Sequence, residues 1–206
     1  MQDYDLATID IILFDLGGVV VEVGAEPFPA DWAANPEEFI QRRSEVFALI
    51  HAFETGAFGA GEFADRLISD FRMQVEAERI IAAFRAWPKG LYPWVETVLP
   101  RLGKNFRLAV LSNSNEIHWP RLLGEFDLGR YFEAMFSSHQ IGAAKPDAES
   151  FRYALEKLKI TPERVLFIDD KKENTEAARR LGLQTLYITI PGTLPETLKT
   201  IPELSP

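Results

Sequence analysis

Hydrophobic positions along the chain fall into two kinds of segment that alternate. Short apolar runs lie at residues 10–14, 107–111, 134–136, 164–168 and 183–188. Amphipathic stretches with helical spacing lie between them, and Gly182 follows one of these, 172–181, where a helix C-cap is expected. Short apolar strands that alternate with helices are typical of a parallel sheet covered on both faces. The pattern therefore predicts an α/β fold built on a doubly wound parallel sheet.

Residues 24 to about 90 interrupt this alternation. The segment begins with a loop, contains no convincing strand, and is closed by the turn-rich sequence PKGLYPW at 88–94. Its helical patterns lie at residues 37–53, 61–71 and 77–87. We therefore expect a small α-helical insertion over residues 23–91, placed between the first two strands of a core that residues 1–22 and 92–206 form.

Polar side chains follow several of the apolar runs directly, or lie in the loop that comes after one. They are Asp15, Ser112, Asn113, Lys145, Asp169 and Asp170. Because ligands bind at the carboxyl ends of the strands in an open parallel sheet, we expect these side chains to meet at one rim. A lone aspartate after a strand is usually only a turn former or a helix N-cap. The hypothesis of a binding site depends on several such residues occurring at the same end of neighbouring strands.

Three of these residues are carboxylates, and bringing them together has an electrostatic cost. Asp15, Asp169 and Asp170 would repel one another and raise one another's pKa values. A bound hard cation removes that cost, and a ligand set of oxygens without His or Cys suits Mg²⁺. Protein-bound Mg²⁺ often shares its coordination with a phosphate, and Ser112 and Lys145 would then donate to the remaining phosphoryl oxygens. The residues therefore predict a phosphate site with Mg²⁺.

Composition narrows the functional class. Of the 206 residues, 47% are hydrophobic and 26% are charged, which is the balance of a globular protein with one substantial core. The net charge of −9 argues against broad contact with nucleic acid, which requires a cationic surface. No cysteine is present, so disulfides, thiolate catalysis and zinc–cysteine sites are excluded. The polar start of the chain and the absence of a long apolar run predict a cytoplasmic protein without a membrane segment.

Four motifs of the chain resemble those of a known superfamily. They are FDLGGVV (14–20), LSNSN (111–115), GAAKP (142–146) and FIDDKKEN (167–174). In order and spacing they resemble the motifs of the haloacid dehalogenase-like (HAD) hydrolases, which implies a Rossmann-like core with a small α-helical cap inserted after the first strand. The DLGG opening, FETGAFGAGEFADRL (53–67) and residues 91–119 are similar to a bacterial subgroup that contains glucose-1-phosphate phosphatase-like proteins.

The resemblance assigns a nucleophile and a metal site by position. It implies that Asp15 attacks phosphorus and forms an aspartyl-phosphate, which water then hydrolyses. It also implies that Mg²⁺ is held by Asp15, by the backbone carbonyl of Gly17 and by Asp169. Asp170 would be a further ligand or would lie in the layer around the ligands.

The same resemblance places the phosphate. It implies that Ser112 and Lys145 bind the transferring phosphoryl group with help from Asn113, and that Asn174 orients the loop that carries the acidic pair. The implied activity is that of a Mg²⁺-dependent phosphatase acting on a small phosphorylated metabolite, with sugar phosphates as the favoured class.

Gly17 departs from the usual pattern of the superfamily's phosphatases. In most of them the residue two positions after the nucleophile is a second aspartate, which protonates the leaving alcohol and then activates water. Gly17 offers only its backbone, although together with Gly18 it lets the chain turn tightly and bring a carbonyl and amides close to metal and phosphate. A positioned general acid is worth ~10²–10⁴-fold in rate, so the departure matters.

Three consequences of Gly17 stay open. Either the substrate carries a good leaving group, as an anomeric sugar phosphate or an acyl phosphate does, or another group supplies the proton, namely a water, Glu116 or His118. The third possibility is that the activity is weak or absent. We favour the first, because the subgroup resemblance independently suggests sugar phosphates. His118 on its own is expected to be a surface histidine on a helix turn.

The helical insertion is expected to close over the site and to select substrates. Its Gly-punctuated segment 51–59 carries Glu54 and Thr55 between Phe53 and Phe58, and this loop is a candidate for facing the substrate. Aromatic residues at helical spacing are more often core residues. We therefore expect packing rather than recognition from the two phenylalanines.

Two other functions are considered. A binding protein that keeps the fold and the phosphate pocket without turnover is favoured by Gly17 alone, and the retention of Asp15 argues against it. A dehalogenase of the same superfamily also uses an aspartate nucleophile and also lacks the second aspartate. Its chemistry needs no metal, however, and it would leave Asp169 and Asp170 without a counter-charge.

Overall fold

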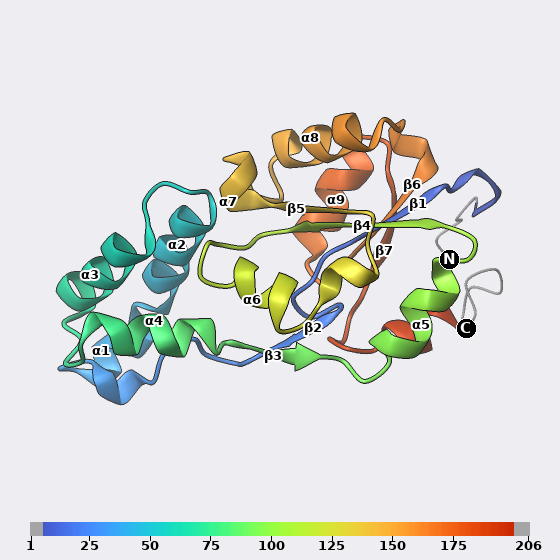
Figure 1. Ribbon diagram of the computed structural model, residues 1–206. Coiled ribbons are helices and arrows are strands. Elements are labelled where there is room, and N and C mark those ends of the chain that lie inside the picture. Colours follow the sequence, from blue (N-terminus) through green and yellow to red (C-terminus); the bar gives the residue numbers. More distant parts are fainter. Residues whose placement is uncertain (1–5, 200–206) are drawn as a thin grey trace.

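The computed structural model of the protein describes residues 6–199 and contains, within them, a parallel sheet of five strands (Figure 1). The strands are β1 (Ile11–Phe14), β4 (Arg107–Ser112), β5 (Ala134–Ser137), β6 (Val165–Asp169) and β7 (Gln184–Tyr187). They lie in the order β5-β4-β1-β6-β7, and each neighbouring pair is parallel. Every apolar run is therefore a strand, and the prediction of a doubly wound, Rossmann-like α/β core is confirmed.

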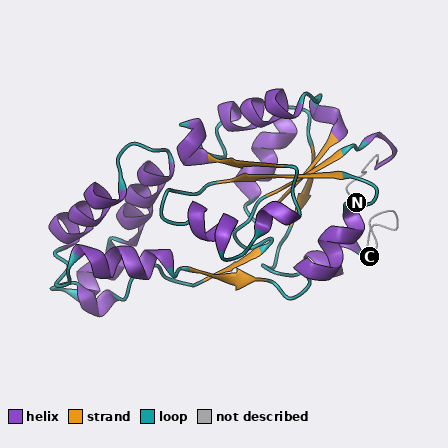
Figure 2. Cartoon of the chain, in the orientation of Figure 1, coloured by secondary structure: helices purple, strands orange, loops and turns teal. Residues whose placement is uncertain are grey.

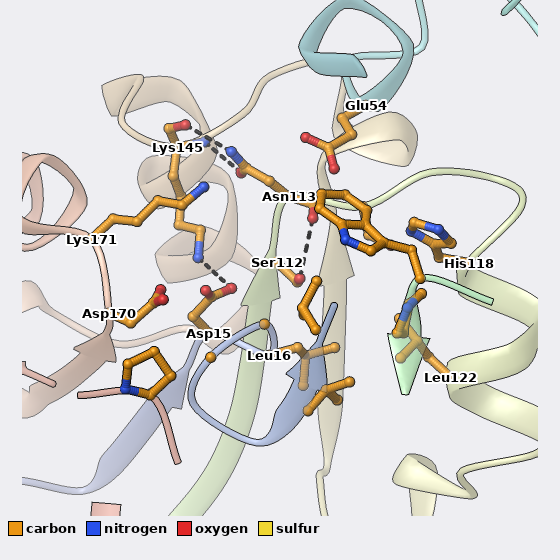
Figure 3. Close-up of a pocket in the computed structure, with 18 of the residues that line it drawn as sticks. Asp15, Leu16, Glu54, Ser112, Asn113, His118, Leu122, Lys145, Asp170 and Lys171 are labelled. Atoms are coloured by element: carbon orange, nitrogen blue, oxygen red, sulfur yellow. Dashed lines mark hydrogen bonds and ion pairs between the residues drawn. The ribbon is translucent and has the colours of Figure 1, made fainter. Parts of the chain in front are cut away.

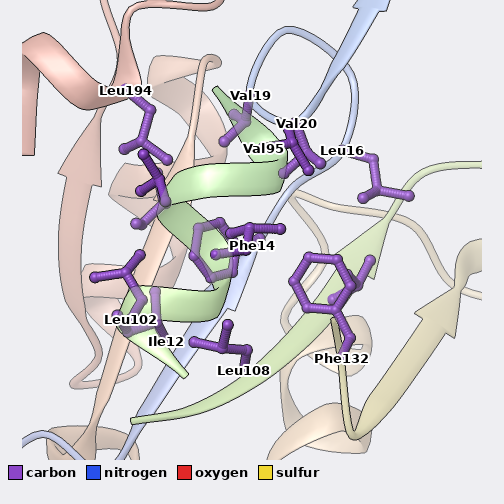
Figure 4. Packing of buried hydrophobic residues seen from close by; sticks show 14 of the residues in the cluster. Ile12, Phe14, Leu16, Val19, Val20, Val95, Leu102, Leu108, Phe132 and Leu194 are labelled. Carbon is purple, nitrogen blue, oxygen red and sulfur yellow. The ribbon is translucent and has the colours of Figure 1, made fainter. Parts of the chain in front are cut away.

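The alternating side chains of β1, the central strand, explain why the core has two layers. Ile12 and Phe14 belong to the hydrophobic cluster on one face of the sheet (Figure 4), whereas Ile11 and Leu13 belong to the cluster on the other. All four side chains are fully buried, as a central parallel strand requires. The first cluster includes residues of α5 (Val95–Leu102), α6 (Trp119–Gly124) and α10 (Leu194–Leu198), and the second includes residues of α8 (Ala148–Leu158) and α9 (Lys172–Arg180). Figure 2 shows these helices on both sides of the strands.

The predicted C-cap of α9 is confirmed. Gly182 has a φ of +92°, its N–H donates to the carbonyl of Arg179, and the N–H of Leu183 donates to the carbonyl of Ala178. This pair of bonds with a left-handed glycine is the usual way of closing a helix before the chain returns to the sheet. It sets the C-terminal end of α9, the helix that begins at Lys172, two residues after Asp170.

Helices occupy most of the segment between β1 and β4, as predicted. They are α1 (Pro36–Gln41), α2 (Arg43–Glu54), α3 (Ala60–Phe71) and α4 (Ala77–Arg85), and we call them the helical insertion. They pack around a cluster of their own, in which the ring of Phe63 lies 4.6 Å from that of Phe53 and 4.9 Å from that of Phe84. The helix expected at 37–53 is interrupted at Arg42, whose guanidinium donates to the Asp70 carbonyl at 2.6 Å.

A two-stranded antiparallel ribbon joins the helical insertion to the core, and the expectation that residues 24–90 contain no strand is wrong here. β2 (Val21–Val23) pairs with β3 (Pro88–Leu91). β3 contains proline, lysine and glycine, which are poor strand formers, and its partner is distant in sequence. Neither propensity nor periodicity therefore reveals it. The division into a core and a cap at 22/23 and 91/92 stays a prediction, and both boundaries fall at this ribbon.

None of the helices in residues 6–199 has both the length and the apolar character that crossing a bilayer requires. The cytoplasmic location expected from the sequence stays a prediction.

Candidate active site

A pocket of about 460 Å³ opens where the carboxyl ends of β1, β4 and β6 face the helical insertion (Figure 3). The predicted site residues that line it are Asp15, Gly17, Gly18, Ser112, Asn113, Lys145 and Asp170. Asp169 lies fully buried beside it, and one of its carboxylate oxygens lies within 4.8 Å of oxygens of Asp15 and Asp170. The volume is that of a site for a small molecule. The structure therefore brings the sequence-predicted residues together at one rim.

Lys145 is buried and contacts two carboxylates. Its Nζ lies 2.7 Å from Asp15 Oδ1 and donates to Asp169 Oδ2 at 2.8 Å. Burial on its own lowers the pKa of this ammonium, but the charges of Asp15 and Asp169 outweigh it and the pKa is raised overall. Lys145 is therefore charged, and it offsets part of the negative charge of the rim.

Asn113 holds Lys145 in place. Its Nδ2 donates to the backbone carbonyl of Lys145, and its Oδ1 accepts from the backbone N–H of Lys145, both at 2.8 Å. Within the described part of the chain, the hydroxyl of Ser112, the last residue of β4, has a single long hydrogen bond, which it donates to the Asn113 carbonyl at 3.4 Å. The Ser112 hydroxyl is therefore able to donate to a ligand in the pocket, whereas the Asn113 amide acts on the position of Lys145.

The two acidic residues at the end of β6 have different environments. Both carboxylate oxygens of Asp169 are used, because besides Lys145 they accept from the backbone N–H of Lys171 at 2.7 Å and from Asn174 Nδ2 at 3.1 and 3.0 Å. Asp170 Oδ1, in contrast, is buried without a hydrogen-bond partner among residues 6–199, and Asp170 lines the pocket. Of the two residues, Asp170 has the oxygen that is free for a cation.

The electrostatics of Asp170 point the same way. Its pKa is raised to about 7, chiefly by burial and then by the negative charges of Asp15 and Asp169. A hard divalent cation among the three carboxylates would give the unpartnered Oδ1 a ligand bond and would offset the repulsion. The donor set consists of oxygens alone, so the residues present fit Mg²⁺.

The two glycines after Asp15 differ in whether the structure leaves room for a side chain at their positions. Gly18 has a φ of +76°, and a Cβ at this position would overlap the carboxylate of Asp170, so the observed position of Asp170 requires glycine there. A Cβ on Gly17 would come no closer than 3.3 Å to a methyl group of Val23. A small side chain at position 17 therefore needs only a slight shift of its neighbour, and the fold does not demand glycine at that position.

The two side chains considered as substitutes for the missing acid are both engaged elsewhere. His118 is buried rather than on the surface, which corrects the expectation from the sequence: its Nε2 lies 2.7 Å from the Phe84 carbonyl, and its Nδ1 lies 3.1 Å from Asn115 Nδ2. Burial lowers its pKa to about 4. Glu116 Oε1 accepts from the backbone N–H of Ala60 at the start of α3 at 2.6 Å. Both residues tie the core to the helical insertion.

The expected contribution of the 51–59 segment comes from Glu54, the last residue of α2, which lines the pocket and is half-buried. Phe53 is a core residue, as expected, and Phe58 packs against it with ring centres 6.1 Å apart. The sequence missed several pocket residues, namely Arg43, Phe47, Trp87, Tyr92 and Lys171. Most of them lie in or beside helices whose periodicity gives no sign of which side chains reach a neighbouring rim.

Comparison with known proteins identifies a family whose model matches this chain. A family model described as haloacid dehalogenase-like hydrolase matches residues 9–182. A phosphorylated carbohydrates phosphatase of Thermotoga maritima is 28% identical over 56% of this chain, and the match spans only 52% of that relative. A probable phosphoglycolate phosphatase of Pseudomonas putida is 29% identical over 89% of this chain and 67% of its own length. A D-ribitol-5-phosphate phosphatase of Bacteroides thetaiotaomicron is 25% identical over 84% of this chain and 89% of its own length.

Solved structures agree with the family model. A HAD family enzyme of Bacteroides thetaiotaomicron, solved in complex with magnesium and inorganic phosphate, has a TM-score of 0.74 and 28% identity, covering 87% of this chain and 93% of its own. An L-2-haloacid dehalogenase of Xanthobacter autotrophicus has a TM-score of 0.65 over 87% of this chain and 77% of its own. At 18% identity, the second likeness concerns the fold alone.

Proposed function

The chain belongs to the haloacid dehalogenase-like hydrolase family, and we propose that it is a Mg²⁺-dependent phosphatase acting on a small phosphorylated metabolite through an aspartyl-phosphate on Asp15. One observation carries the proposal. Asp15 lies at the carboxyl end of the central strand, on the wall of a pocket, 2.7 Å from the ammonium of Lys145 and with a carboxylate oxygen within 4.8 Å of one of Asp170. A nucleophile, a cation and a vacant oxygen ligand thus meet where a phosphate ester can enter.

In this proposal, different residues bind the phosphoryl group, position the binding residues and attack phosphorus. Lys145 and the Ser112 hydroxyl donate to the phosphoryl oxygens, and Asn113 positions Lys145 by its two backbone hydrogen bonds. Asp15 attacks phosphorus and is released again when water hydrolyses the aspartyl-phosphate.

Asp15, Asp170 and the Gly17 carbonyl would hold Mg²⁺, which supplies positive charge that offsets the charge developing on the phosphoryl group. Asp169 orders this site through Lys145, Lys171 and Asn174, because its oxygens are already used by these donors. The proposal thus exchanges the roles of the acidic pair. The sequence resemblance gives Asp169 as a metal ligand and Asp170 as a further ligand or a residue around the ligands.

Sugar phosphates are the substrate class that we favour. The pocket is of the size for a metabolite, and beyond the rim its wall combines the aromatic rings of Phe47, Trp87 and Tyr92 with the charged side chains of Arg43 and Glu54. Flat apolar rings next to polar groups suit a carbon skeleton that carries hydroxyls. The names of the relatives from Thermotoga and Bacteroides, which refer to phosphorylated carbohydrates and to ribitol 5-phosphate, support the same class.

A binding protein without turnover is the second candidate, and Gly17 is the observation that favours it. The missing side chain removes the usual proton donor while leaving the phosphate pocket intact. The dehalogenase alternative has less support, because three clustered carboxylates with a free oxygen suit a metal that dehalogenation does not need.

Phosphate release from a panel of esters tests the proposal. The panel holds an aryl phosphate, sugar 1-phosphates, sugar 6-phosphates and acetyl phosphate, each measured with Mg²⁺ and with chelator. We expect metal-dependent release that Asp15→Asn abolishes and that Asp65→Asn, an exposed aspartate on α3, leaves unchanged. Tight binding of a phosphate ester without any release would instead establish the binding protein.

A further inference from the structure

Among the described residues that line the pocket, Glu54 is the one acidic residue that belongs to the helical insertion. The side chain comes from the end of α2 and faces the rim, while Asp15 lies at the end of β1 on the opposite side of the pocket (Figure 3). Among the described residues, the carboxylate of Glu54 has neither a salt bridge nor a hydrogen bond that would hold it, in contrast to Glu116 and His118. It is therefore available to a ligand.

The backbone of Glu54 is fixed more firmly than a loop residue would be. The N–H of Gly56 donates to the Phe53 carbonyl and that of Ala57 to the Ala52 carbonyl, with Gly56 at a φ of +76°. These bonds close α2 directly after Glu54. A Cβ on Gly56 would lie 3.0 Å from the His139 carbonyl, so the turn also sits close against α7 (Ser138–Ile141).

One serine hydroxyl links Glu54 to the catalytic rim. Ser138 Oγ, at the start of α7, lies 2.5 Å from the Glu54 carbonyl and accepts from the backbone N–H of Ser114 at 2.9 Å. Ser114 belongs to the loop that begins with Ser112 and Asn113 at the end of β4. The same loop that would contact the phosphate therefore helps to fix the backbone from which the Glu54 side chain projects.

The charges around Glu54 suit an exchange of protons near neutral pH. The charged and titratable groups that face it or line the same pocket are Asp15, Arg43, Tyr92, His118, Lys145, Asp170 and Lys171, with His139 on the adjoining α7. The pKa of Glu54 is raised to about 7 by burial, with Asp15 raising it and the two lysines lowering it. Near neutral pH it is therefore present in both protonation states, so it can both donate and accept a proton.

We propose that Glu54 is the general acid and base of the reaction and replaces the side chain that is missing at Gly17. The proposal rests on the proposed phosphatase function. Displacement at phosphorus is roughly in line, so the leaving oxygen, and later the attacking water, lie on the side of phosphorus away from Asp15. That side faces the helical insertion, from which Glu54 projects.

The two steps balance in atoms and charge. In the first, an oxygen of Asp15 bonds to phosphorus, the bond from phosphorus to the leaving oxygen breaks, and the proton of Glu54 moves to that oxygen, which leaves as an alcohol. In the second, a water oxygen bonds to phosphorus, the bond from phosphorus to Asp15 breaks, and the water's proton moves to the Glu54 carboxylate. Glu54 ends protonated, and the products are the alcohol and inorganic phosphate.

The test compares Glu54→Gln with the wild type in rapid-quench experiments on two esters, glucose 6-phosphate and p-nitrophenyl phosphate. An alkyl leaving group needs a proton, whereas nitrophenolate does not. We expect Glu54→Gln to slow the first turnover of the sugar phosphate by ~10²–10⁴-fold. We expect it to release nitrophenolate in a rapid burst of one equivalent and then to stall, because the second step lacks its base.

Two further measurements separate proton transfer from a merely structural role. In the wild type the first turnover of the sugar phosphate should fall as pH rises above about 7, the pKa of Glu54, and Glu54→Gln should lose this dependence. The double variant Gly17→Asp/Glu54→Gln should recover sugar-phosphate turnover, because it returns a carboxylic acid to position 17, where a Cβ comes no closer than 3.3 Å to a methyl group of Val23. Glu62→Gln, an exposed carboxylate on α3, is the matched control and should behave as the wild type.

The outcomes discriminate between the two proposals. Equal losses on both esters, or no loss on either, would overturn the role of Glu54, as would a rise in KM with unchanged kcat and pH profile. If Glu54→Gln failed to fold, a wild-type pH profile without the fall above pH 7 would overturn it. A wild type that releases no phosphate from any ester with Mg²⁺ would instead overturn the phosphatase function itself.

Discussion

The ammonium of Lys145 lies 2.7 Å from the carboxylate of Asp15 in a pair that is almost shielded from solvent, with exposed fractions of 1% and 10% for the two side chains. Taking two charges out of water is costly, and a buried ion pair is a weak source of net stability even when its geometry is good. Such a pair is therefore better explained by binding than by folding. Its place at the end of the central strand agrees with a nucleophile held beside a phosphate-binding cation.

Replacing Lys145 should reveal how much negative charge it offsets. We expect Lys145→Met to lower the free energy of unfolding by about 3–5 kcal/mol in chelator, because Asp15 and Asp169 then lose their buried cationic partner. Mg²⁺ should restore part of the loss by supplying another cation. Urea denaturation with and without Mg²⁺ measures both effects, and Lys104→Met, at an exposed site, is the control. A variant as stable as the wild type in chelator would contradict the prediction.

The two members of the acidic pair should respond differently to removal of their charge. Asp170→Asn should abolish measurable Mg²⁺ binding, because Asp170 Oδ1 is the oxygen without another partner. Asp169→Asn should weaken binding by only about 10–100-fold, the usual cost of losing a residue that orients the ligands, and should also reduce stability. Isothermal titration of each variant with Mg²⁺ makes the comparison. Equal losses of affinity would argue against the assignment.

The sheet and its rim could be predicted from the sequence because their signals are local. Each strand is a short apolar run, and a parallel sheet places the residue after each run at one edge, so the sequence alone is enough to group Asp15, Ser112 and Asp170. The pairing of β2 with β3 and the break at Arg42 were missed. Both depend on partners that lie far away along the chain, and neither leaves a periodic pattern.

The side chains across the pocket were harder to predict for a related reason. The sequence places His118 on the surface and gives no sign of its burial against Phe84. That burial depends on how the helical insertion packs on the core. Glu54 was recognised only as part of a loop that could face the substrate. Its raised pKa comes from the burial that the folded pocket imposes, which no local pattern of residues reports.

The glycine pair after Asp15 should show unequal tolerance. Gly18→Ala should reduce stability and Mg²⁺ affinity, because its Cβ would overlap Asp170 and the backbone is left-handed. Gly17→Ala is the matched control and should change both little, since the nearest atom to its Cβ is a Val23 methyl at 3.3 Å. Thermal unfolding with and without Mg²⁺ compares the two. Equal loss in both variants would mean that the turn itself, rather than the contact with Asp170, requires glycine.

His118 should make the protein sensitive to acid. Because its pKa is lowered to about 4 by burial, from the ordinary 6.5, the unfolded chain takes up a proton at a higher pH than the folded one. The contribution of neutral His118 to the free energy of unfolding is fully present above pH 6.5. On the order of 2–3 kcal/mol of it is lost as pH falls toward 4. His118→Gln should reduce this part of the slope. Denaturant unfolding between pH 4 and 8 measures it, with exposed His51→Gln as the control that keeps the slope.

Ser138 should influence turnover through the position of Glu54, although it lies outside the lining of the pocket. Ser138→Ala leaves the Ser114 N–H without its acceptor and frees the end of α2 from α7, so we expect a loss of about 1–3 kcal/mol in stability. A displaced acid should also slow turnover of alkyl phosphates, by about 10–100-fold, while nitrophenolate release in the first turnover stays fast.

The control for this variant is another buried serine at the start of a core helix. Ser150→Ala removes the 2.8 Å hydrogen bond that Ser150, in the first turn of α8, donates to the carbonyl of Asp147 just before that helix; neither residue lines the pocket. It should lose stability to a similar extent and keep its preference among esters. If Ser138→Ala and Ser150→Ala slowed alkyl and aryl phosphates alike, the effect of Ser138 would be one of general stability. A selective loss for alkyl phosphates in Ser138→Ala alone would place Glu54 within reach of the leaving oxygen.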